Sequence, residues 1–89
     1  MITKQDLPQK VQDAIDAIAN DPDVKELVKR VESDSVPTTR HNYGRYMNLI
    51  TTMSHGSENM GYIIGLALIQ AGANRQGVTD ALKVHSFQG

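Results

Sequence analysis

The chain contains no cysteine and no tryptophan, and its only aromatic side chains are three tyrosines and one phenylalanine. The absence of cysteine excludes a disulfide framework and a thiolate metal site. With so few aromatic residues, the core must be built from alanine, valine, isoleucine, leucine and methionine. This composition favours helices.

Long hydrophobic runs are also missing. The longest apolar stretch, residues 62–69, includes Gly65. It is far shorter than the roughly 20 residues that a transmembrane helix needs. The N-terminus has no basic segment followed by an apolar core. We therefore expect no membrane insertion and a cytoplasmic location.

The charges are few and unevenly distributed. The net charge is −1, yet residues 1–37 carry five basic and eight acidic side chains, whereas residues 38–89 carry four basic and two acidic ones. An anionic partner would therefore be favoured near the C-terminal half of the chain.

Apolar residues recur at helical spacing along most of the chain. The pattern predicts a single all-α domain over residues 1–89, a compact bundle of four to five short helices. Residues 1–32 would form an acidic helical hairpin and residues 38–85 a three-helix part. The side chains expected to cap the five helices are Thr3 or Asp6, Asp21 before Pro22, Thr38 or Thr39, Ser57, and Asn74.

The predicted fourth helix is apolar on nearly all sides. We expect Ile63, Ile64, Ala67, Leu68 and Ala71 to face one neighbour, and Tyr62, Leu66 and Ile69 to face another. Such a helix is either central or part of a subunit contact. The sequence therefore predicts a homo-oligomer, with Ile63, Leu66 and Ile69 at its interface.

Residues suited to catalysis or metal binding do not converge in the sequence. The acidic residues gather in the N-terminal helices, where a solvated face explains them. His41, His55 and His85 have no ligand partner at metal-binding spacing. We expect no enzymatic activity, no metal and no cofactor.

A first candidate site lies at the predicted start of the third helix. Arg40, His41, Tyr43, Arg45 and Tyr46 gather within seven residues. Guanidinium groups and a helix N-terminus favour phosphates, and tyrosine rings can stack on bases. This pattern predicts a site for an anionic ligand. Alternatively, the two tyrosines belong to the core and the arginines are surface charges.

A second candidate is a helix-turn-helix unit over residues 64–83. Its DNA-reading face would be Arg75, Gln76, Thr79 and Lys83. The pattern departs from repressor-type units because Leu68 occupies a crossing usually given to a small residue, and Leu66 and Ile69 stand at normally polar positions. Plain packing of two short helices explains the same apolar pattern.

Three stretches, residues 42–47, 71–78 and 80–82, resemble segments of small uncharacterised proteins of tailed bacteriophages. The resemblance implies an accessory protein that acts in the host cytoplasm by inhibiting or sequestering a host or defence component. We therefore expect a non-catalytic homo-oligomer that binds a protein partner or an anionic nucleotide ligand. The alternative function is that of a helix-turn-helix DNA-binding regulator.

Overall fold

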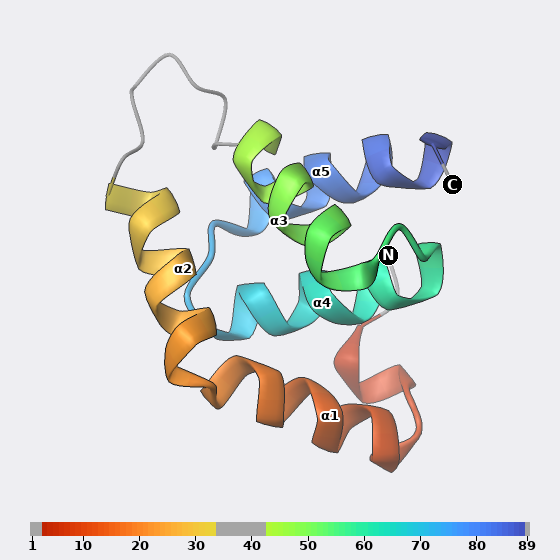
Figure 1. The fold of residues 1–89 in the computed structure, drawn as a ribbon. Coiled ribbons are helices and arrows are strands. Elements are labelled where there is room, and N and C mark those ends of the chain that lie inside the picture. Colours follow the sequence, from red (N-terminus) through yellow and green to blue (C-terminus); the bar gives the residue numbers. More distant parts are fainter. Residues whose placement is uncertain (1–2, 34–42, 89) are drawn as a thin grey trace.

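The computed structural model describes the backbone of residues 3–33 and 43–88, and the side chains of these residues as far as Lys83. The described residues form a short 3-10 helix and five α-helices (Figure 1). Their bounds are η1 Lys4–Asp6, α1 Gln9–Asn20, α2 Pro22–Ser33, α3 Tyr43–Ser54, α4 Glu58–Gln70 and α5 Arg75–Gln88. The expectation of an all-α bundle is confirmed.

The first helix begins later than the sequence suggested. Thr3 and Asp6 cap only the short turn η1, and α1 starts at Gln9 with Pro8 before it. The break falls at Leu7, which is extended at φ −97° and ψ 155°. A residue that precedes proline is sterically driven out of the helical region, so one continuous helix from Thr3 cannot form.

Three of the expected N-caps are confirmed by hydrogen bonds. The carboxylate of Asp21 accepts the backbone N–H of Asp23 at the start of α2. The hydroxyl of Ser57 accepts the N–H of Met60 at the start of α4, and the amide oxygen of Asn74 accepts the N–H of Gly77 in α5. The expected caps Thr38 and Thr39 lie outside the described residues.

The ends of α3 and α4 follow the turn residues. Beyond Ser54, His55 and Gly56 adopt positive φ values of 53° and 80°, and Gly72 follows α4 at φ 110°. The N–H of Ala73 then reaches back to the carbonyl of Leu68 at 2.9 Å. A left-handed residue after the last turn closes a helix by offering such a bond to its terminal carbonyls.

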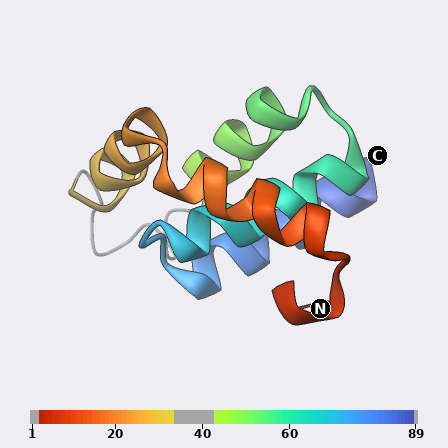
Figure 2. The same ribbon diagram turned by 90° about the horizontal axis from the view of Figure 1, so that it is seen from below.

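The most apolar helix, α4, lies at the centre of the fold. It packs against α1, α3 and α5, and more lightly against α2. Figure 2, viewed from below, shows α1 crossing in front of α4. Gly61, Ile64, Gly65, Ala67 and Leu68 are buried along its length. A helix that is apolar all round must be surrounded, and here one chain supplies the surroundings.

Two core clusters meet at α4, but the sequence-based division of its faces was partly wrong. Ile64 and Leu68 pack with residues of α2, α3 and α5, and Tyr62 and Ile69 also lie against this cluster. Ala67 joins Ile15 and Ala19 of α1 in the second cluster, which is flanked by Ile63 and Leu66. Ile63 and Leu66 were expected on opposite faces, yet both lie beside α1.

The second helix is attached through only part of its apolar stripe. Val24 and Val28 are buried in the larger cluster, and Leu27 is 37% exposed. α2 contacts α1 and α4 but does not pack closely along α3. The space between α2 and α3 is therefore open to solvent.

Candidate functional site

Tyr46 belongs to the core and is not a ligand-stacking residue. Its side chain is 0% exposed, and its hydroxyl donates a hydrogen bond of 2.5 Å to Glu32 at the end of α2. Burial, reinforced by the neighbouring carboxylate of Glu32, raises the pKa of Tyr46 well above its usual value. A fully buried ring offers no face to a nucleobase, so the ligand-binding role predicted for Tyr46 is corrected to that of a core residue.

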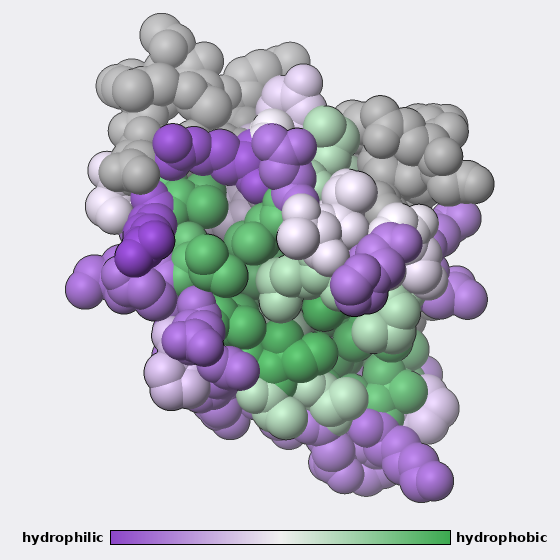
Figure 3. All heavy atoms as spheres, in the orientation of Figure 1, coloured by the Kyte–Doolittle hydropathy of each residue, from purple (hydrophilic) through white to green (hydrophobic). Residues whose placement is uncertain are grey.

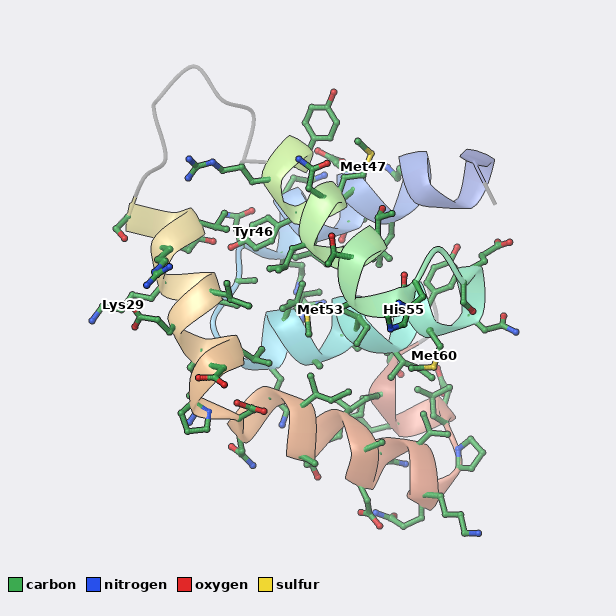
Figure 4. All side chains as sticks on the ribbon, viewed as in Figure 1. Lys29, Tyr46, Met47, Met53, His55 and Met60 are labelled. Carbon is green, nitrogen blue, oxygen red and sulfur yellow. The ribbon has the colours of Figure 1, made fainter. Side chains whose placement is uncertain are left out.

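Glu32 joins three helices at one carboxylate oxygen. Besides the Tyr46 hydroxyl, that oxygen accepts the backbone N–H of Asn74 at 2.7 Å, directly before α5. Figure 4 shows Tyr46 lying between α2 and the start of α3. A buried tyrosine hydroxyl needs such an acceptor, and a charged acceptor makes the stronger bond. This contact holds the end of α2 beside α3 and α5.

Two other members of the predicted anion site, Tyr43 and Arg45, are described, whereas Arg40 and His41 lie outside the described residues. The ring of Tyr43 is 39% exposed on α3, and Arg45 is exposed on the side of α3 that faces α2. Of the three predicted residues that the structure describes, Arg45 lines a surface groove.

A groove of about 410 Å³ lies between α2 and α3. It is lined by Leu27, Arg30 and Val31 of α2 and by Arg45, Asn48, Leu49 and Thr52 of α3. We call it the α2–α3 groove. In Figure 3, hydrophobic surface gathers in a hollow between α2, α3 and α1, and hydrophilic side chains border it. A concave apolar surface with a few polar groups is the usual form of a binding site.

Among the residues that the structure describes, two cations and no acid line the groove. Arg30 does approach Glu26 one turn earlier on α2, at 3.5 Å, but both side chains are more than half exposed. An exposed pair of this kind is worth little because solvent screens it. The carboxylate of Glu32 is turned toward Tyr46 and Asn74. The groove therefore favours an acidic guest.

Sequence reasoning missed six of the seven groove residues. In the sequence, Leu27 and Val31 continue the apolar stripe of Val24 and Val28, and Asn48 and Thr52 lie on the polar side of the third helix. One signal was available, since α2 has four apolar residues in its stripe but buries only Val24 and Val28. Apolar side chains that the neighbouring helices do not bury stay exposed and can contact another molecule.

The helix-turn-helix segment is formed by α4, Gly72 and α5. Arg75, Gln76 and Lys83 are exposed and Thr79 is half-buried, while Ala73, Val78 and Ala81 are buried between the helices. Leu82 of α5 lies directly against Gly65 of α4. A Cβ atom at Gly65 would lie 2.9 Å from Cδ1 of Leu82. The amide of Gln76 is bonded to Asp80.

The predicted interface residues Ile63, Leu66 and Ile69 are half-buried within the single chain. Ile63 and Leu66 line a hollow of about 240 Å³ with Leu7 and Val11. Leu66 and Ile69 line a second hollow of about 260 Å³ beside Lys4 and Arg75. The N-terminal segment thus covers part of the surface that the sequence left for a neighbour. Self-association through these residues stays a prediction.

The carboxylate of Asp16, beside the second hollow, already has hydrogen-bond partners. Asp16 accepts hydrogen bonds from Lys4 and from Gln70, and the bond from Lys4, followed by that from Gln70, lowers the pKa of Asp16. Among the described residues, no group of three histidine or acidic side chains could hold a metal ion. Within the same part of the chain, no helix is long and apolar enough to cross a membrane.

Comparison with known protein families, with curated proteins and with solved structures finds no match for this chain. The resemblance of residues 42–47, 71–78 and 80–82 to bacteriophage proteins therefore stays a prediction.

Replacing Tyr46 with phenylalanine tests the contact at Glu32. We expect Tyr46→Phe to lower the free energy of unfolding by about 1.5–3 kcal/mol, because the buried tyrosine loses its hydrogen bond to the carboxylate of Glu32. Tyr43→Phe is the matched control, since Tyr43 is exposed on the same helix, and it should change stability by less than about 0.5 kcal/mol. Urea unfolding measures both, and equal effects would contradict the assigned contact.

Proposed function

We propose that this chain is a non-catalytic accessory protein that holds an acidic partner protein in the α2–α3 groove and thereby blocks the partner. The observation that carries the proposal is the lining of the groove, in which the apolar Leu27, Val31 and Leu49 are joined by Arg30 and Arg45 and, among the described residues, by no acidic side chain. Inhibition by occupancy requires a complementary surface and no catalytic group. It also agrees with the role that the phage resemblance implies.

A protein partner is better supported than a nucleotide. Nucleotide binding was expected because Tyr43 and Tyr46 could stack on a base, but Tyr46 is buried, and the described residues that line the groove include no aromatic side chain. Leucine and valine side chains suit apolar side chains of another protein. The expected self-association would use Ile63, Leu66 and Ile69, which do not line the groove, so the two kinds of contact are compatible.

Photocrosslinking in the producing cells tests this proposal. A photoreactive amino acid at Asn48, inside the groove, should give an adduct with one partner through an acidic segment. The same amino acid at Thr51, which is exposed on α3 but outside the groove, should give none. Adding Arg30→Glu should abolish the adduct, because an attractive charge becomes repulsive.

The matched control for charge is Lys29→Glu. Lys29 neighbours Arg30 on α2, and Figure 4 shows its side chain pointing away from α3. The Lys29 variant should retain the adduct. Adducts of equal yield from Asn48 and Thr51, or equal losses in the two charge variants, would refute the proposal.

DNA binding is a second candidate, favoured by the geometry of the turn between α4 and α5. Gly72 has φ 110°, and the buried Ala73, Val78 and Ala81 leave Arg75 and Lys83 exposed on one side of α5. A recognition helix needs one side that packs on its own domain and one exposed side that can contact DNA. The surface carries few cations for phosphate contacts, and Asp80 lies among them.

A binding assay with mixed-sequence duplex DNA decides this candidate. If α5 contacts phosphates, the affinity should fall steeply as salt rises, with each phosphate contact contributing about one unit to the logarithmic salt slope. Arg75→Ala should weaken binding at low salt and reduce that slope by about one. Lys29→Ala, on α2 and outside the predicted DNA-reading face, should leave both unchanged. No binding at low salt would exclude this function.

A further inference from the structure

The shape of the α2–α3 groove, together with the proposed function, identifies the kind of segment that it accepts. The walls are two helices that run beside each other without close packing. On α3, the groove extends from Arg45 to Thr52, which corresponds to about 10 Å of helix at 1.5 Å per residue. A guest of about two helical turns fills this length.

Two other common modes of peptide recognition do not fit. Addition of a strand requires an exposed sheet edge, and the described residues contain helices and no strand. Recognition of a polyproline segment requires a groove lined by aromatic rings, and the seven residues that line this groove include none. A mode that does fit two helical walls with apolar side chains is an amphipathic helix lying with its apolar face in the groove.

The positions of the apolar residues support this mode. Leu27 and Val31 are one turn apart on α2, and Leu49 lies across from them on α3. Leu27 is 37% exposed, so it can gain burial when a guest arrives. Side chains one turn apart on a guest helix match this spacing, because residues i and i+4 lie on the same face.

The charges determine the polar side of the guest. Arg30 and Arg45 stand on opposite walls of the groove, so a helix that lies between them would meet a cation on each side. Acidic residues flanking its apolar stripe would pair with both. A basic helix would be repelled.

We propose that the α2–α3 groove binds about two turns of an acidic amphipathic α-helix of the partner protein, with apolar anchors one turn apart against Leu27, Val31 and Leu49 and with carboxylates beside Arg30 and Arg45. The inference rests on the proposed function and adds the secondary structure and charge of the bound segment. The partner is recognised through side chains.

Synthetic peptides of roughly 15 residues, a length at which helices become marginally stable in water, test the inference directly. The first peptide places leucines one turn apart on one face of an alanine helix and flanks them with glutamates. The second has the same composition in scrambled order. The third keeps the leucine pattern and replaces each glutamate with lysine.

We expect the first peptide to bind and to gain helicity, with amide shifts in the NMR spectrum of the protein concentrated on α2 and α3. The scrambled and basic peptides should bind at least about tenfold more weakly, because one loses the apolar face and the other gains like charges. Combining Arg30→Glu with Arg45→Glu should lower the affinity of the protein for the first peptide by about tenfold or more. Lys29→Glu should change that affinity by less than about twofold.

Binding of the scrambled peptide with equal affinity, or amide shifts outside α2 and α3, would overturn the inference, because charge alone or another surface would then explain the binding. Arg30, Arg45 and Lys29 are all exposed, and thermal unfolding checks that each variant remains folded. If the peptides fail while adducts at Asn48 persist, the bound segment is not an acidic helix and the proposed function stands. If both fail, the proposed function fails as well.

Discussion

The fold depends on covering α4. This helix is apolar on nearly every side, so leaving any long face in water would be costly. α1, α3 and α5 each pack against it, and their buried side chains join two clusters that meet along its length. Gly65 allows α5 to come close enough for Leu82 to lie against the α4 backbone.

The groove follows from this arrangement. With α1, α3 and α5 on α4, the second helix reaches the core through Val24 and Val28 and is held at its far end by Glu32. The chain places Leu27 and Val31 opposite Leu49 without packing them tightly. Covering α4 with α1, α3 and α5 therefore leaves an apolar surface between α2 and α3, which Arg30 and Arg45 also line.

The helices, their turns and most of their caps could be predicted because they depend on local signals such as Asp21–Pro22, Ser57, Gly72 and Asn74. The start of α1 was misjudged because the effect of Pro8 on Leu7 outweighed the capping potential of Thr3. The site was largely missed, since the wall formed by Asn48 and Thr52 depends on where α2 lies. Helical spacing alone cannot distinguish a solvated face from a face that borders a groove.

Helices of the same chain cover most of α4, and α2 is the helix held least firmly. Native-state hydrogen exchange in dilute, monomeric protein tests both statements. Amides of α4 should exchange only through global unfolding, whereas those of α2 should exchange through a partial opening of lower free energy. Amides of α4 that exchange as readily as those of α2, and become protected only at high protein concentration, would contradict both.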